Sequence, residues 1–331
     1  MLPPRLGLVA ALMVSLVRAA APVPSAAAPK APAVSDPEKR KYELPVPPDE
    51  NVAYGPHRMQ VIYFWRARSD RPTPLLFYIH GGGWNGGDRS VVRNMLVPAL
   101  QAGISVASVE YRTIRDATAD GVIPPVRAPM LDCARALQFC RSKAAEWNLD
   151  KTRIAAAGGS AGACTSLWLA FHDDLADPLS PDLVARESTR VTCAAVEGAQ
   201  TSLDPHQMRA WTPNITYGAH AFGITADASR KLSSFQVFHE SRERILPWIR
   251  EYSPYELVSR GDPPVGLYYS APPNLCQPEK DPTHSANFGV KLKERCDADG
   301  VPCELVYPGA TGVRHATMDE FVRAHLRPKS G

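Results

Sequence analysis

The sequence lacks the features that mark several large classes of protein. Its 331 residues contain no internal repeat, and 37 lysines and arginines nearly balance 34 aspartates and glutamates, which leaves a formal net charge of +3. Such a balance gives no reason to expect a nucleic-acid partner. No spacing of cysteine and histidine matches a zinc site, so we expect no metal. We also expect no other cofactor. The composition, 44% hydrophobic and 21% charged, is that of an ordinary soluble globular protein.

Long apolar runs are scarce as well. One run, residues 6–17, follows Arg5 and precedes small residues suited to cleavage, which is the pattern of a secretory signal peptide over residues 1–20. It is shorter than the roughly 20 apolar residues of a stable membrane span, although an uncleaved anchor is the alternative. Residues 21–50 are rich in alanine, proline and charge and predict a flexible linker. We therefore expect an exported protein, periplasmic or extracellular, with a folded domain over residues 51–328.

The seven cysteines are an odd number, so at least one must be free or bonded to another chain. Cys133 and Cys140 fall on one predicted helix about 10 Å apart, which is beyond the reach of a disulfide. Cys276 could pair with Cys296 or Cys303 in an exported protein, and free thiols at these positions are the alternative.

Strand-like segments alternate with helix-like ones along most of the chain. Strands are predicted at residues 59–64, 75–79, 104–110, 153–157, 191–196, 265–270 and 303–307. Helices are predicted at residues 91–101, 128–147, 163–170, 287–298 and 318–326. Such alternation predicts an α/β protein with a mostly parallel sheet covered by helices on both faces. Binding sites in these sheets lie beyond the carboxyl ends of the strands.

Residues 204–254 interrupt this alternation and are unusually rich in aromatic side chains. We predict that they form a small cap insertion over the site; a packed helical insertion without substrate contact is the alternative. Trp211 and Tyr217 in this segment, together with Trp84, are the candidate substrate-binding aromatics.

The most informative motif is Gly158-Gly159-Ser160-Ala161-Gly162, which follows a strand-like run of small residues and precedes a helix-like one. In this context a serine occupies a sharp, strained turn with its hydroxyl exposed above the helix N-terminus, and the glycines leave room for neighbouring backbone. An ordinary turn is the alternative for so short a pattern. The flanking segments favour Ser160 as a catalytic nucleophile.

A second glycine-rich segment, HGGGW at residues 80–84, follows another predicted strand directly. The amides of Gly82 and Gly83 can point at a substrate carbonyl together with the amide of Ala161, as an oxyanion hole requires. A phosphate-binding loop is disfavoured, because bulky Trp84 interrupts the glycines and no Lys-Ser or Lys-Thr pair follows.

A serine nucleophile needs a general base, and the base needs a carboxylate that orients it. His315 follows the last predicted strand and precedes the last predicted helix, which favours it as the base; His284 also follows a late strand. Asp281, in the loop after the strand at residues 265–270, is the favoured acid. Glu279 stays open as its alternative.

Several motifs in order along the chain together resemble the α/β-hydrolase esterases with an HGGG-type oxyanion loop. They are HGGGW at 80–84 with Gly87-Asp88, Glu110-Tyr111-Arg112, GGSAG at 158–162, Ser253-Pro254, Asp281, and Tyr307-Pro308-Gly309 ahead of His315. This branch includes hormone-sensitive-lipase-like enzymes and exported acetyl and feruloyl carbohydrate esterases. The resemblance covers about residues 59–326 and implies the α/β-hydrolase fold, Ser160 as nucleophile, His315 as base, Asp281 as acid, and oxyanion amides from Gly82, Gly83 and Ala161. The chain departs from the pattern at Ser270-Ala271, where His-Gly is common, and at residues 310–314, which lengthen the approach to the histidine.

The expected function is that of a serine esterase that forms an acyl-enzyme on small, acetyl-type esters, with a small-molecule or polysaccharide ester as its substrate. A serine peptidase of the prolyl-oligopeptidase type is disfavoured, because only about fifty residues precede the predicted domain and leave no room for a propeller. A non-catalytic binding protein on a hydrolase scaffold is the alternative from another class. The sequence gives no oligomeric state.

Overall fold

The computed structural model describes residues 44–327, apart from the side chain of Arg93. The predicted signal peptide and most of the predicted linker lie outside the described residues. The described part is built on an eight-stranded sheet in the order β1-β2-β4-β3-β5-β6-β7-β8. Strands β3 to β8 run parallel to one another, whereas β2 pairs antiparallel with both β1 and β4 at one edge. This is the mostly parallel sheet that the alternation predicts.

The strands are β1 (Glu50–Ala53), β2 (Val61–Trp65), β3 (Thr73–Ile79), β4 (Ser105–Val109), β5 (Leu149–Gly159), β6 (Cys193–Glu197), β7 (Val265–Tyr268) and β8 (Cys303–Val306). The helices are η2 (Arg89–Val92), α1 (Arg93–Gln101), α2 (Ile114–Ala119), α3 (Arg127–Ser142), α4 (Ala144–Trp147), α5 (Ala161–Phe171), α6 (Pro205–Trp211), η3 (Ala219–Phe222), α7 (Ser234–Glu240), α8 (Arg242–Tyr252), α9 (Pro254–Leu257), η4 (Pro282–His284), α10 (Asn287–Asp299) and α11 (Met318–Leu326). Each strand and helix predicted from the sequence has its counterpart here.

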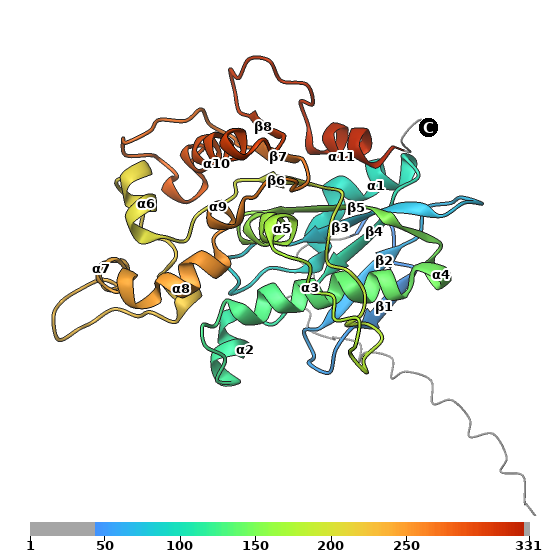
Figure 1. Cartoon of the computed structure of the whole chain (residues 1–331), viewed down its shortest axis with the longest axis horizontal. Coiled ribbons are helices and arrows are strands. Elements are labelled where there is room, and N and C mark those ends of the chain that lie inside the picture. Colours follow the sequence, from blue (N-terminus) through green and yellow to red (C-terminus); the bar gives the residue numbers. More distant parts are fainter. Residues whose placement is uncertain (1–43, 328–331) are drawn as a thin grey trace, which may run out of the picture. The chain divides into compact units, whose positions relative to one another are not determined.

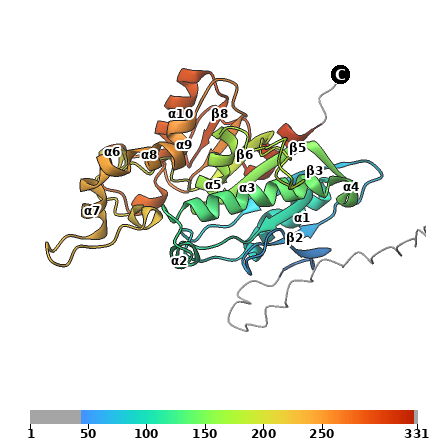
Figure 2. The same cartoon turned by 60° about the horizontal axis from the view of Figure 1, so that its bottom comes forward.

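Helices pack on both faces of the sheet (Figures 1 and 2), and the side chains of β3 alternate between the two resulting cores. Leu75, Phe77 and Ile79 face the larger core, which includes α3 and α5, whereas Leu76 faces a smaller core with α1 and α11. All four are fully buried, and burial of each such side chain stabilises the fold by about 1.5–3 kcal/mol. Because both faces are covered, the ends of the strands are where side chains reach solvent.

The folded part begins earlier than the sequence predicts. Strand β1 starts at Glu50 and pairs with β2, and the carbonyl of Val46 accepts a hydrogen bond from the Trp65 indole at 3.0 Å. Leu44 and Val46 also pack against the smaller core. Residues 44–50 therefore belong to the domain rather than to the linker, because two apolar side chains anchor them to the sheet.

Residues 205–252, between β6 and β7, form the helices α6, η3, α7 and α8; we call this segment the helical insertion. Both views place α6, α7 and α8 beside one end of the sheet, away from α4 (Figures 1 and 2). Phe235 and Phe238 of this segment are fully buried and belong to the larger core. Its aromatic residues thus serve packing within the domain.

All seven cysteines fall within the described residues, and all are free thiols. Cys276 is exposed and Cys296 is buried, so the bridge considered from the sequence is not formed. Among the described residues, no helix combines the length and the apolarity needed to span a bilayer, and no group of three or more histidine, cysteine or acidic side chains could hold a metal ion.

Candidate active site

Ser160 occupies the sharp turn between β5 and α5 that the sequence predicts. Its backbone has φ 53° and ψ −121°, a strained conformation for a residue with a side chain. Gly158 and Gly162 flank the turn so closely that a Cβ on either would collide with the Ile79 carbonyl of β3. The Ser160 amide donates to the Glu197 carbonyl at the end of β6, at 2.9 Å. The turn is therefore fixed from both sides by the ends of neighbouring strands.

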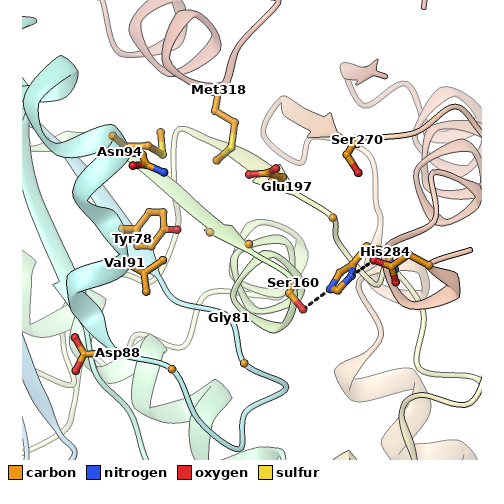
Figure 3. Close-up of a pocket in the computed structure, with 17 residues that line it drawn as sticks. Tyr78, Gly81, Asp88, Val91, Asn94, Ser160, Glu197, Ser270, His284 and Met318 are labelled. Carbon is orange, nitrogen blue, oxygen red and sulfur yellow. Dashed lines mark hydrogen bonds and ion pairs between the residues drawn. The ribbon is translucent and has the colours of Figure 1, made fainter. Parts of the chain in front are cut away.

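The histidine that meets Ser160 is His284, not His315. The Ser160 hydroxyl lies 3.0 Å from His284 Nε2, within hydrogen-bond distance (Figure 3). His284 ends η4, a single turn that follows β7 after a long loop. A hydroxyl donating to an imidazole nitrogen at this distance is the arrangement of a nucleophile and its general base.

Asp281 lies on the other side of the same imidazole. Its Oδ2 is 2.8 Å from His284 Nδ1, and its Oδ1 accepts from the His284 backbone amide at 3.3 Å. Partial burial acts to raise the pKa of Asp281, but the hydrogen bonds and charge of His284 outweigh it and lower that pKa. The carboxylate is thus ionised and holds Nδ1 protonated, which leaves Nε2 free to accept the serine proton.

The structure separates Asp281 from Glu279, which the sequence left open. The Glu279 carboxylate accepts from the Ser285 hydroxyl at 3.1 Å, and its backbone pairs with Asn214. Asp281 is the carboxylate that contacts the histidine, as favoured from the sequence.

His315 is held elsewhere, so the prediction that it contacts Ser160 is wrong. Its Nδ1 lies 2.9 Å from Glu304 Oε1 on β8, and its ring packs edge-on against Phe321 of α11. The Tyr268 hydroxyl donates to its carbonyl at 3.1 Å. The long segment after β8 therefore folds onto the end of the sheet and α11 instead of reaching the serine.

A local signal for His284 was present in the sequence. Residues three apart on a 3₁₀ turn lie on the same face, and Asp281-Pro282-Thr283-His284 places a proline at the first position of such a turn. The short Asp-x-x-His spacing could have identified the pair. Position after the last strand, which favoured His315, is a weaker guide because two neighbouring loops end near the same edge of the sheet.

The glycine-rich loop, residues 80–87, leaves β3 beside the serine. Gly82 and Gly83 have φ of 108° and 61°, conformations that favour glycine. Among the described residues, the amides of Gly82, Gly83 and Ala161 donate to no protein atom. Of the three, Gly82 lines the cavity at Ser160. Free amides beside a nucleophile match the donors of an oxyanion hole.

A buried ion pair supports this loop from below. His80 Nε2 lies 3.0 Å from Glu110 Oε1, and its Nδ1 lies 2.8 Å from the Gly81 carbonyl. Burial acts to lower the pKa of His80, but the Glu110 carboxylate outweighs it and raises that pKa. The Tyr111 ring stacks on the imidazole, and its hydroxyl donates to the His80 carbonyl at 2.8 Å. His80 therefore packs and binds within the loop and does not face the serine.

A cavity of about 790 Å³ opens at Ser160 and His284. Its lining is mixed: the polar side chains of Tyr78, Asn94, Glu197 and Ser270 share it with the apolar Val91, Met95 and Met318 (Figure 3). Burial and the neighbouring Glu197 raise the pKa of Tyr78 to about 12, so its hydroxyl stays a hydrogen-bond donor at neutral pH.

None of the three predicted substrate-binding aromatics lines this cavity. Trp84 is fully buried and its indole donates to the Thr165 hydroxyl at 3.0 Å. Trp211 packs against Tyr255 in the core. Tyr217 lies behind the glycine-rich loop, and burial raises the pKa of its phenol. Their size and their positions in a loop and an insertion favoured a role in substrate binding. In the structure, all three side chains pack against the core instead.

The sharp turn at Ser160, the glycine-rich loop and the Asp281–His284 pair all lie at the carboxyl edge of a mostly parallel sheet. This arrangement defines an α/β-hydrolase fold. The BD-FAE family model matches residues 62–271. The chain belongs to this family.

A known esterase is similar to part of the chain in sequence. Esterase LipC of Mycobacterium tuberculosis (strain ATCC 25618 / H37Rv) is 33% identical over 117 residues, which are 34% of this chain and 27% of that protein. The chain thus spans about a quarter of that relative's length.

Solved structures share the fold. An acetyl ester-xyloside bifunctional hydrolase from Caldicellulosiruptor lactoaceticus has a TM-score of 0.58 at 20% identity, covering 79% of this chain and 86% of that one. A truncated carbohydrate esterase from gut microbiota has a TM-score of 0.59 at 19% identity, covering 83% and 95%. Identities this low show the fold alone.

Proposed function

We propose that the protein is a serine carboxylic-ester hydrolase with Ser160 as nucleophile, His284 as general base and Asp281 as the orienting acid. The observation that carries this proposal is the continuous chain from Ser160 Oγ through His284 to Asp281 Oδ2, at 3.0 and 2.8 Å, on the wall of a cavity. Membership of the BD-FAE family and the partial identity to an esterase support it.

The geometry performs acyl transfer in two steps. His284 Nε2 takes the Ser160 proton as the oxygen attacks the ester carbonyl, and the carbonyl oxygen becomes negative. The amides of Gly82, Gly83 and Ala161 are the donors that stabilise it. His284 then protonates the leaving alcohol, and an acyl-serine remains. Water, activated by the same imidazole, attacks this ester and releases the acid.

The substrate is a small acyl ester of an alcohol with several hydroxyl groups. The polar lining at Tyr78, Asn94 and Ser270 supplies partners for hydroxyls. A neighbour in fold is an acetyl ester-xyloside hydrolase and another is a carbohydrate esterase, which supports acetylated carbohydrates. Export under a signal peptide at residues 1–20 belongs to the same proposal, and N-terminal sequencing of the protein secreted by its host would test it.

Hydrolysis of p-nitrophenyl acetate by the wild type and by Ser160→Ala tests the proposal. We expect turnover by the wild type and a loss of at least about 10⁴-fold in kcat for the variant, since the nucleophile is gone. Release of acetate from acetylated xylan, compared with esters of rising acyl length, tests the substrate class. No turnover by a folded wild type would point to the alternative, a binding protein on this scaffold.

A further inference from the structure

The glycine-rich loop contains a backbone conformation that needs outside support. Gly82, Gly83 and Trp84 follow one another with φ of 108°, 61° and 56°. The first two are natural for glycine, but a bulky residue such as Trp84 is strained there. Strain of this kind persists only where the surrounding contacts over-determine it, and it gathers at functional sites. The contacts that hold Trp84 therefore bear on the donors next to it.

The body of the domain supplies two of these contacts. The Trp84 indole donates to the Thr165 hydroxyl of α5 at 3.0 Å, and the Ile114 amide of α2 donates to the Trp84 carbonyl at 2.8 Å. Both act on Trp84 itself. Neither contacts the Gly83 carbonyl, which belongs to the peptide group between Gly83 and Trp84.

The helical insertion supplies the third contact. His220 of η3 lies with Nε2 3.0 Å from the Gly83 carbonyl oxygen. A carbonyl only accepts, so Nε2 carries the proton and donates it. Burial lowers the pKa of His220, and the imidazole is neutral at pH 7. Its ring also packs edge-on against Tyr217 at 4.8 Å and lies 6.1 Å from the Trp84 indole, which leaves it little freedom to turn away.

We propose that His220 is a positioning residue that holds the oxyanion amides in place from the helical insertion. By fixing the Gly83 carbonyl, it fixes the plane of the peptide that joins Gly83 to Trp84 and so restricts ψ of Gly83, at the end of the segment that carries the two glycine amides. The amides of Asn85 and Gly86 hold the preceding peptide through the Gly82 carbonyl, at 3.0 and 3.2 Å. The insertion, none of whose residues lines the cavity, then acts on the glycine-rich loop through this hydrogen bond. The inference rests on the proposed ester hydrolysis for its kinetic consequence.

His220→Phe removes the donor and keeps an aromatic ring, while His220→Gln keeps an amide donor. Loss of a whole oxyanion donor lowers kcat about 10²–10³-fold. Misplaced amides cost less, and we expect His220→Phe to lower kcat about 10–50-fold with KM within about twofold. His220→Gln should restore at least part of this loss. Inhibition by a trifluoromethyl ketone, which binds the serine as an oxyanion, should weaken in proportion to kcat.

His206→Phe is the matched control. His206 also lies in the helical insertion, and its Nε2 lies 3.2 Å from a backbone carbonyl, that of His239, away from the loop. Its kcat should stay within twofold of the wild type. An equal loss in both histidine variants, or unchanged ketone inhibition in His220→Phe, would overturn the proposal.

Amide hydrogen exchange separates this inference from the proposed function. Peptides covering residues 80–92 should exchange faster in His220→Phe than in the wild type or in His206→Phe, whether or not the protein turns over any ester. Unchanged exchange there would overturn the positioning role. If the wild type showed no turnover but the variant exchanged faster, the proposed ester hydrolysis would be overturned. The positioning role of His220 would then still be established.

Discussion

The glycine-rich loop and the Asp281–His284 turn approach Ser160 from different sides, and different contacts hold them (Figure 3). The loop rests on a buried pair: the side chains of His80 and Glu110 are 1% and 9% exposed. The turn is open to water, with His284 38% and Asp281 64% exposed. One half of the site depends on tertiary packing, and the other on hydrogen bonds between residues three positions apart. Substitutions that remove the contacts of the glycine-rich loop should therefore unfold it, whereas substitutions in the Asp281–His284 turn should only misalign that turn.

The largest expected effect concerns the identity of the base. His284→Asn should lower kcat for p-nitrophenyl acetate about 10⁴-fold, because no group remains to take the serine proton. His315→Asn should stay within about threefold, since His315 pairs with Glu304 and not with the serine. Similar losses in both, with both variants folded by circular dichroism, would contradict the geometry.

The buried pair below the loop should matter chiefly for stability. Glu110→Gln removes one partner of a buried ion pair, which costs about 3–5 kcal/mol of unfolding free energy. The raised pKa of His80 means that the folded state binds this proton more tightly than the unfolded one. The contribution of protonated His80 to the unfolding free energy is complete below about pH 6.5, the usual histidine pKa. It is lost as the pH rises through the raised pKa of His80.

Urea unfolding at pH 5.5 and pH 9 checks both statements. The difference in unfolding free energy between the wild type and Glu110→Gln should be smaller at pH 9 than at pH 5.5. Glu146→Gln, which removes an exposed pair with Lys143, is the control and should stay within about 0.5 kcal/mol. A difference independent of pH would show that His80 is neutral in the folded protein.

The acid should have a smaller effect than in a buried triad. Loss of a buried triad aspartate costs about 10⁴-fold in kcat, but water can solvate the imidazolium beside the exposed Asp281. We expect Asp281→Asn to lower kcat about 10–100-fold, and Glu279→Gln to change it by less than threefold. A greater loss at Glu279, measured with the same ester, would reverse the assignment.

The smallest effect tests what ties the turn to the sheet. Gln200 is fully buried, and its amide nitrogen donates to the carbonyls of Gly198 at 2.9 Å and Thr283 at 2.8 Å. Gln200→Met should lower kcat about three- to tenfold with KM unchanged, because the turn loses its tether.

Gln138→Met provides the matched control for this tether. Gln138 is likewise buried and donates to backbone carbonyls, among them Glu187 at 2.8 Å, far along the chain from the base. Its loss should lower the melting temperature without changing kcat. Equal kinetics in the two variants would mean that the turn holds its shape alone.

Much of the domain followed from local pattern. The predicted strands and helices are present because apolar runs and periodicity report which faces must be buried. The sharp turn at Ser160 could be predicted because this strand–turn–helix motif depends only on five consecutive residues and the elements beside them. β1 went unpredicted, since its four residues alternate between half-buried and exposed at the sheet edge and carry little apolar signal.

The predicted aromatics show the limit of such reasoning. Trp84 and Trp211 have the composition of a binding surface, yet both are buried in the core. Whether an aromatic side chain faces a cavity or a neighbouring helix depends on which elements pack against it. Composition does not carry that information.

The sequence by itself determined the order of the strands and helices, the strained turn at Ser160, and a glycine loop with free amides, because each is encoded by neighbouring residues. The tertiary structure alone decided which histidine reaches the serine. His284 and His315 both follow late strands at the same edge of the sheet, and Glu304 on β8 draws one of them away. A contact between residues 124 positions apart depends on how two loops pack, and no local pattern records it.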